Sequence, residues 1–194
     1  MKDKIKIRAV TTDDTDALLK IYDYYVKNTA ITYEYETPSH DEFFGRIEQI
    51  TRKYPYIAAE KDGKIIGYAY ASQFHPRAAY SWDAEMTIYL DHTCRGLGVG
   101  TKLYDMLEAI LAEQGFVNAI ALITPPSEAA DPSMYGSMHF HEKRGYRLMG
   151  MIENCGYKFN TWYNTVWMYK QLNAPQKDMK EVITFDDVRE KFGI

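Results

Sequence analysis

Residues 95–101 read Arg95-Gly96-Leu97-Gly98-Val99-Gly100-Thr101, with glycines at alternate positions. An apolar run, 84–90, precedes this stretch, and an apolar stripe at helical spacing follows it as far as Gly115. A strand that feeds a glycine-rich turn and then a helix presents unpaired backbone N–H groups and the positive end of the helix dipole. We therefore expect an anionic, phosphate-bearing ligand at this loop.

Two common phosphate-binding motifs do not fit the loop. The phosphate loop of nucleotide hydrolases requires a glycine directly before Lys102, and Thr101 occupies that position. The dinucleotide fingerprint would also need glycine at 101, and no acidic residue closes the next apolar run, which ends in Ile123-Thr124. A loop that merely turns the chain remains the alternative, although alternating glycines exceed what a turn requires.

Outward from the loop, the hydrophobic periodicity predicts strands and helices in mixed order. Strands are expected at 5–10, 56–60, 65–71, 84–90, 116–123, 146–152 and 165–172. Helices are expected around 17–25, 43–50, 99–111 and 134–143. Asp62-Gly63 is a hairpin signal between two of the strands. The order strand, glycine loop, helix, strand predicts a parallel crossover from 84–90 to 116–123.

Composition excludes several classes of protein. The chain has 194 residues, of which 46% are hydrophobic and 26% charged, as in ordinary globular proteins. Its net charge of −4 disfavours nonspecific binding to nucleic acid. No apolar stretch approaches the roughly 20 residues that span a bilayer, and the N-terminus lacks a signal-peptide core. We therefore expect a cytoplasmic protein with no nucleic-acid or membrane partner. Cys94 and Cys155, without metal-ligand spacing, predict reduced thiols and no metal site.

Several further motifs narrow the interpretation of the loop. They are Tyr54-Pro55-Tyr56, Gly67-Tyr68-Ala69-Tyr70-Ala71, Tyr80-Ser81-Trp82-Asp83-Ala84-Glu85, His141-Glu142-Lys143-Arg144-Gly145-Tyr146 and the stretch 156–162 that opens Gly156-Tyr157-Lys158. With the glycine loop, and in this order, they resemble the phosphinothricin acetyltransferase family of the GNAT N-acetyltransferase superfamily over residues 5 to 172.

The resemblance implies a fold, a co-substrate and an acceptor. The fold is α/β (α+β): the GNAT fold, with a mixed central sheet of about seven strands, helices on both faces and strands that splay apart at the acetyl-CoA site. Residues 1–173 would form the acetyltransferase domain, and 174–194 an extension docked on the body or on a partner chain. Acetyl-CoA would be the co-substrate, and a small amino-acid-like primary amine of the phosphinothricin, methionine sulfone or sulfoximine type the acceptor. The family tendency is a homodimer.

Glu85 and His141 are the candidate catalytic residues. Attack on a thioester requires a neutral amine, yet an α-amino group is only about a tenth neutral at pH 7. Glu85, on the strand that leads into the glycine loop, can supply the base directly or through water. The alternative for Glu85 is an ordinary salt-bridged carboxylate. His141 stands where many superfamily members have a proton-donating tyrosine; it could be the acid, a substrate ligand or structural.

The resemblance also assigns the binding residues. Residues 95–101 would hold the pyrophosphate, while the backbone of Ile88, Tyr89 and Leu90 would pair with the pantetheine arm and stabilise the oxyanion. Ser127 or Met134, depending on where a gap is placed, stands for the usual asparagine after the loop helix, within a stretch, 126–136, that is longer than is typical.

The expected acceptor pocket contains four residues: Tyr33, Tyr35, Arg77 and Tyr80. The aromatic rings would face the ammonium group, and the guanidinium would take a carboxylate or phosphinate. Plain packing is the alternative for all four. Two other functions stay open: acetylation of a peptide N-terminus or protein lysine, and CoA sensing without catalysis.

Overall fold

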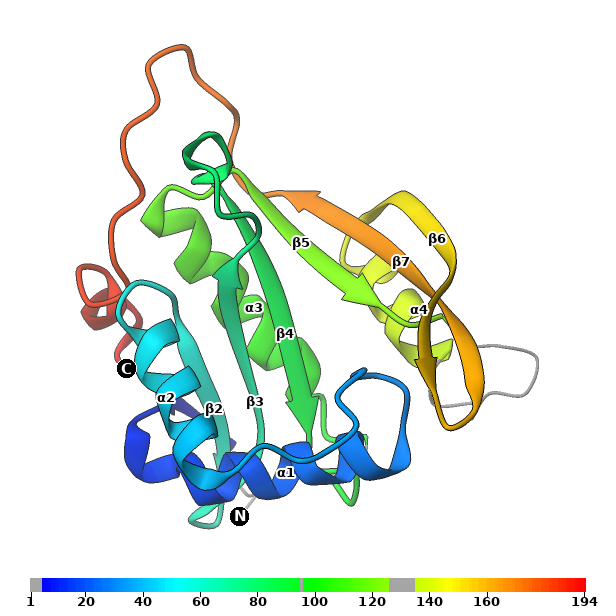
Figure 1. Cartoon of the computed structure of the whole chain (residues 1–194). Coiled ribbons are helices and arrows are strands. Elements are labelled where there is room, and N and C mark those ends of the chain that lie inside the picture. The colour runs from blue at the N-terminus through cyan, green and yellow to red at the C-terminus, as the bar shows by residue number, and fades with distance from the viewer. Residues whose placement is uncertain (1–4, 95, 126–134) are drawn as a thin grey trace.

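A single mixed sheet organises the chain. The computed structural model describes residues 5–94, 96–125 and 135–194. Within them, seven strands follow the order β1-β2-β3-β4-β5-β7-β6 (Figure 1). The strands are β1 (Lys6–Ala9), β2 (Tyr56–Lys61), β3 (Lys64–Gln73), β4 (Asp83–Leu90), β5 (Asn118–Ile123), β6 (Arg147–Lys158) and β7 (Thr161–Gln171). Only β4 and β5 pair in parallel, so the predicted crossover through the glycine loop is confirmed.

Helices cover both faces of the sheet, as expected. They are α1 (Thr15–Asn28), α2 (His40–Thr51), α3 (Val99–Gln114) and α4 (Tyr135–Lys143). In Figure 1, α1 and α2 lie in front of β2, β3 and β4, and α3 lies behind them. The start of α2 is fixed by Ser39, whose hydroxyl accepts a hydrogen bond from the Glu42 N–H at 3.2 Å.

The alternation of side chains along the strands produces two cores. On the α3 side, small residues such as Ala69 and Ala71 pack against Leu103 and Leu107. On the α1 and α2 side, tyrosines replace the small residues. These are Tyr56 from β2, Tyr68 from β3 and Tyr89 from β4, packed with Leu18, Tyr22 and Ile47.

Strands β4 and β5 separate part-way along their length. They pair only where Asp83, Ala84 and Glu85 lie opposite 118–120. Beyond Glu85, β4 continues beside β3 while β5 pairs with β7, and the two strands diverge (Figure 1). The expected splay therefore begins at Glu85.

The last two strands are longer than the sequence pattern predicts. β6 and β7 run almost continuously through a hairpin at Phe159-Asn160, both with positive φ, instead of being confined to 146–152 and 165–172. β6 is an edge strand whose residues are mostly exposed, so the alternation that marks a half-buried strand is missing. Asn154, with φ of 50°, lies in the irregular register between Ile152 and Gly156.

The C-terminal segment, 174–194, packs against its own chain. Phe185 and Val188 are buried in the core beside α3. The Ile183 N–H donates to the Gln114 carbonyl at 3.1 Å, and the Gln114 side chain donates to the Ile183 carbonyl at 2.8 Å. No helix in the described part of the chain is long and apolar enough to cross a membrane.

Candidate active site

The glycine loop lines a cavity of about 450 Å³, which we call the loop cavity. Gly96 and Gly98 have φ of +76° and +68°, conformations that side chains disfavour, and Gly98 is the N-cap of α3. The first backbone N–H groups of α3 have no partner within the helix. The loop can therefore bind an anion through its backbone, as the sequence predicts. Arg95 lies outside the described residues.

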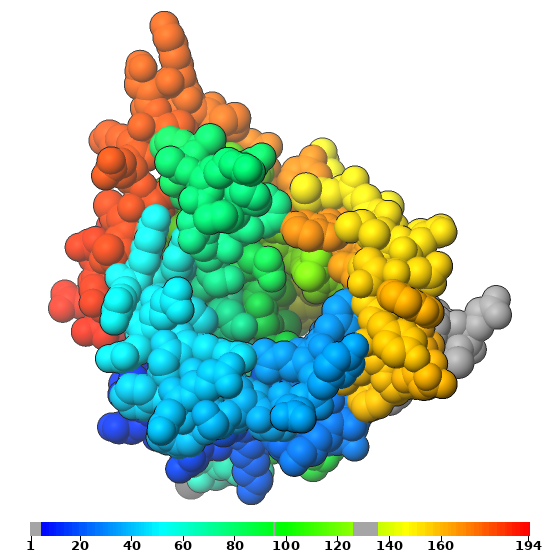
Figure 2. Space-filling model, viewed as in Figure 1, coloured from blue at the N-terminus to red at the C-terminus, as the bar shows by residue number. Residues whose placement is uncertain are grey.

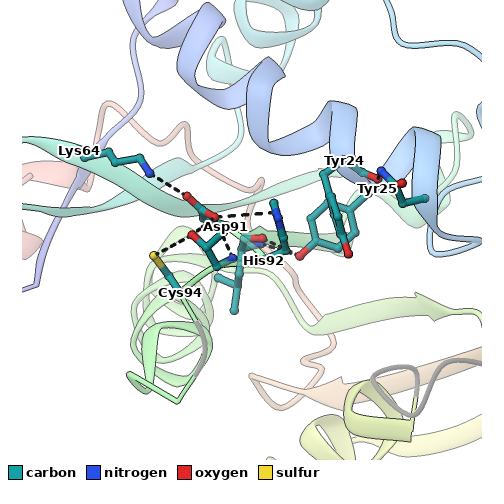
Figure 3. A network of polar contacts seen from close by, with 9 residues as sticks. Tyr24, Tyr25, Lys64, Asp91, His92 and Cys94 are labelled. Atoms are coloured by element: carbon teal, nitrogen blue, oxygen red, sulfur yellow. Dashed lines mark hydrogen bonds and ion pairs between the residues drawn. The ribbon is translucent and has the colours of Figure 1, made fainter.

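Asp91, at the end of β4, fixes the strand where it enters the loop (Figure 3). Its carboxylate accepts hydrogen bonds from Lys64 Nζ at 3.0 Å, from the Thr93 hydroxyl at 2.6 Å and from the Thr93 N–H at 2.9 Å. Burial alone would raise the pKa of Asp91, but these bonds outweigh it and lower the pKa to about 2. The loop therefore starts from a strand end that stays ionised and fixed.

Two tyrosines of α1 complete this arrangement (Figure 3). The Tyr24 ring stacks on the His92 imidazole with centroids 3.8 Å apart, and the Tyr25 hydroxyl donates to the Leu90 carbonyl at 2.6 Å. Both tyrosines line the loop cavity, as does Leu90. Helix α1 thus forms the wall that faces the glycine loop.

A second cavity, of about 270 Å³, opens where β4 and β5 separate; we call it the reaction cavity. Glu85 and His141 both line it, although they come from different elements. Glu85 makes no hydrogen bond or ion pair with any described residue. Because burial disfavours its charged form, the pKa of Glu85 is raised. A partly buried carboxylate without a partner is suited to accept a proton near neutral pH.

His141 is held in one tautomer by two hydrogen bonds. Its Nδ1 lies 2.7 Å from the Ser137 carbonyl, which can only accept, so Nδ1 carries the proton. Nε2 therefore accepts from the Tyr104 hydroxyl, 2.9 Å away. Burial lowers the pKa of His141, although its bond to Ser137 opposes the effect. The neutral imidazole and the Tyr104 hydroxyl thus form one unit on the wall of the reaction cavity.

Tyr104 was missed by the sequence analysis. It lies on α3 within the apolar stripe, where an aromatic residue is typical of the hydrophobic core, and it is 1% exposed. Arg144 stacks on its ring at 5.4 Å and bonds Glu108, which also accepts from Lys170. This ion-pair group behind Tyr104 ties α3, β7 and the segment that ends α4 together.

Tyr33 lines the reaction cavity from the connection between α1 and α2. Its hydroxyl donates to the Asn164 carbonyl at 3.1 Å. Its ring lies directly on Gly156, where an added Cβ would come within 2.2 Å of the ring. A glycine at this point in β6 is therefore what allows Tyr33 to reach the cavity wall.

The other three predicted acceptor residues lie elsewhere. Tyr35 is 69% exposed, and its hydroxyl donates to the Tyr157 carbonyl. Arg77 and Tyr80 lie in the connection from β3 to β4, where both contact His75. None of the three lines the loop cavity or the reaction cavity.

The predicted cofactor residues divide between the cavities. Ile88 and Tyr89 line the reaction cavity, whereas Leu90 and residues 96–101 line the loop cavity. Ile31 lines both cavities, so the two adjoin. The predicted position Ser127 and its alternative Met134 lie outside the described residues.

A third cavity, of about 410 Å³, lies on the α1 and α2 face; we call it the tyrosine cavity. Tyr70 and Tyr89 line both this cavity and the reaction cavity. Figure 2 shows a hollow in this face, bordered by α2, the connection that follows α1, the β3–β4 connection and the β6–β7 hairpin. The reaction cavity therefore adjoins both the loop cavity and the tyrosine cavity.

Comparison with known proteins agrees with this geometry. The sequence profile of the acetyltransferase (GNAT) domain matches residues 7–167. The chain belongs to the GNAT acetyltransferase family. It is therefore an acyltransferase, and the loop cavity of this GNAT chain fits a phosphate-bearing co-substrate through its exposed N–H groups.

Several proteins similar to this chain have names that state the acceptor. It is 31% identical to the phosphinothricin N-acetyltransferase of Streptomyces viridochromogenes, over 92% of this chain and 94% of that protein. It is 27% identical to the L-methionine sulfoximine/L-methionine sulfone acetyltransferase of Pseudomonas aeruginosa, over 86% and 93%. A phosphinothricin acetyltransferase of Sinorhizobium meliloti in complex with AcCoA superimposes with a TM-score of 0.81 and 30% identity, over 93% and 98%.

Proposed function

We propose that this GNAT acetyltransferase transfers the acetyl group of acetyl-CoA to the primary amine of a small amino-acid-like acceptor, of the phosphinothricin, methionine sulfone or sulfoximine type. The observation that carries the proposal is the unpartnered carboxylate of Glu85 at the point where β4 and β5 separate. The names of the relatives support the choice of acceptor.

Transfer takes place by direct attack while both substrates are bound. The glycine loop and the backbone of Ile88, Tyr89 and Leu90 hold the CoA moiety, so the thioester reaches Glu85 from the loop side. Glu85 takes a proton from the ammonium group, directly or through water, and the free amine nitrogen attacks the carbonyl carbon. The C–S bond then breaks, the attacking nitrogen loses its second proton to water, and the thiolate leaves. General-base help of this kind contributes roughly 10²- to 10⁴-fold.

The Tyr104–His141 pair is our candidate for returning a proton to the thiolate. The Tyr104 hydroxyl gives its proton to sulfur as the C–S bond breaks, and the phenolate then takes a proton from water. Neutral His141, whose N–H faces the Ser137 carbonyl, can only accept from Tyr104. The bond from His141 Nδ1 to the Ser137 carbonyl keeps the ring oriented throughout. His141 therefore positions the donor instead of giving a proton itself.

We also propose that the protein is a cytoplasmic homodimer. β6 leaves one edge of the sheet unpaired and exposes large apolar side chains. These are Leu148, Met149, Met151 and Ile152, with Trp162 on β7, each more than half exposed. A patch of this kind marks an association surface. Met151→Glu should convert a dimer into a monomer in light scattering after gel filtration, and a wild-type monomer would refute the proposal.

Acetyl transfer can be tested with acetyl-CoA and a panel of amines. Thiol release and a product heavier by one acetyl group are expected with L-methionine sulfone or phosphinothricin. Transfer only to peptide N-termini would reassign the acceptor, and tight acetyl-CoA binding without transfer to any amine would favour a sensor.

A further inference from the structure

The tyrosine cavity contains hydroxyl groups that the protein does not use. Tyr56 and Tyr68 line it and are 2% and 1% exposed. Neither hydroxyl has a hydrogen-bond partner among the described residues. Among the described residues, the buried side-chain atoms that lack a hydrogen-bond partner include Gln114 Oε1 but neither of these hydroxyls, so both hydroxyls reach the cavity space. A hydroxyl group that reaches a cavity and has no protein partner can donate to a molecule bound there. These hydroxyls therefore give the cavity two donors that are available to a polar molecule or group.

The sheet register places this cavity directly beside the reacting groups. Tyr56 lies opposite Tyr70, and Tyr70 lies opposite Thr87, two residues along β4 from Glu85 and on the same face. The Tyr56 and Tyr70 rings are 4.7 Å apart between centroids. An acceptor whose amine lies at Glu85 can thus extend its side chain past Tyr70 towards Tyr56 and Tyr68.

The charges around the cavity select against an anionic side chain. Arg46 is the one cation among the described residues that line it. Its guanidinium is already paired, through Nη1 to Glu34 at 2.7 Å and through Nη2 to Glu42 at 2.5 Å. Two carboxylates around one guanidinium leave no excess positive charge to bind a phosphinate or carboxylate.

We infer that the tyrosine cavity is the subsite for the acceptor's side chain, and that this side chain ends in a neutral group with hydrogen-bond-accepting oxygens, such as a sulfone, sulfoximine or amide. The inference rests on the proposed function and sharpens it. It ranks methionine sulfone above phosphinothricin as an acceptor. It makes Tyr56 and Tyr68 the residues that distinguish an oxidised side chain from its unoxidised isostere.

The test compares L-methionine sulfone, L-methionine and phosphinothricin, with thiol release as the assay. The variants are Tyr56→Phe and Tyr68→Phe, which keep the rings. Tyr169→Phe, on β7 and outside the three cavities, is the control. Each cavity variant should lower the ratio of kcat/KM for the sulfone over methionine by roughly 2- to 10-fold, as expected for one neutral hydrogen bond. The control should leave the ratio unchanged, and wild type should prefer the sulfone to phosphinothricin.

Several results would overturn the inference. One is an unchanged ratio of kcat/KM for the sulfone over methionine in both cavity variants, which would mean that only water occupies the cavity. Another is a preference for phosphinothricin over the sulfone. A fall in Tm of either variant well beyond that of the control would mean that the hydroxyl is bonded within the protein. Transfer to other amines but not to the sulfone would defeat this inference alone, whereas no thiol release with any amine would defeat the proposed function as well.

Discussion

Replacing Glu85 by Gln removes a proton acceptor while keeping the shape of the side chain. Glu85 is the one carboxylate among the described residues that line the reaction cavity, and His141 accepts from Tyr104 there, so no neighbouring base takes over. We expect kcat/KM at pH 7 to fall by roughly 10²- to 10⁴-fold. The remaining activity should rise about tenfold per pH unit below the pKa of the amine, because only the free amine then reacts.

The pH dependence of the wild-type enzyme follows from the same residue. A base works when deprotonated, so kcat/KM should be lost as pH falls through the raised pKa of Glu85. This acid limb should lie above the ordinary glutamate value of about 4.3, and in Glu85→Gln it should be replaced by the dependence on the amine pKa alone.

The free energy of unfolding should depend on pH in the opposite direction to activity. Because folding raises the pKa of Glu85, its charged form is disfavoured in the native state, and stability is lost as pH rises from the unfolded to the folded pKa. Glu85→Gln should therefore raise Tm at pH 7 to 8, with the gain disappearing below about pH 4.

Glu60→Gln on β2 is the matched control. Its carboxylate is bonded to Arg8 Nε at 2.9 Å, so this variant should keep activity and gain no stability. An unchanged pH profile in Glu85→Gln would place the base elsewhere. A lower Tm at neutral pH would refute the claim that Glu85 is buried without a partner.

Three further substitutions test the parts around the base. Gly98→Ala forces a residue with a side chain into φ of +68°, which costs roughly 1–2 kcal/mol of backbone strain. It should raise KM for acetyl-CoA but not for the amine. The control Gly45→Ala on α2 should change neither KM. Tyr104→Phe leaves the imidazole Nε2 without its donor and should lower kcat about tenfold with both KM values unchanged; unaltered kcat would exclude it from proton return. Gly156→Ala would place a Cβ 2.2 Å from a tyrosine ring and should raise KM for the amine, measured beside Gly150→Ala, where space is open.

Much of the fold could be predicted because its signals are local. The Asp62-Gly63 turn has φ of 53° and 74° at its two residues, as the hairpin signal requires. The apolar stripe after the glycine loop forms α3, and Gly115 ends that helix with φ of 98°. The parallel crossover follows from these elements and from chain order alone.

The β6–β7 hairpin could not be predicted in the same way. Its edge strand is mostly exposed and carries no alternation, and its turn is Phe159-Asn160 instead of a glycine turn. Sequence patterns report burial, so a long ribbon that the chain leaves exposed gives a weak signal.

The two catalytic candidates could be named from the sequence, whereas the tyrosines that share a cavity could not. Glu85 was predicted from its position on the strand whose continuation leads into the glycine loop. The structure brings Glu85 and His141 to one cavity, and their roles remain predictions. The chain has 17 tyrosines, and which of them share a cavity depends on the pairing of β2, β3 and β4. That pairing groups Tyr56 with Tyr68, neither of which was among the predicted acceptor residues.

A crystal structure with CoA and L-methionine sulfone bound together tests the account most directly. The account predicts the CoA phosphates on the glycine loop and the acceptor amine within hydrogen-bond distance of Glu85, or one water away. An amine bound beside Arg77 in the β3–β4 connection, with Glu85 out of reach, would contradict it.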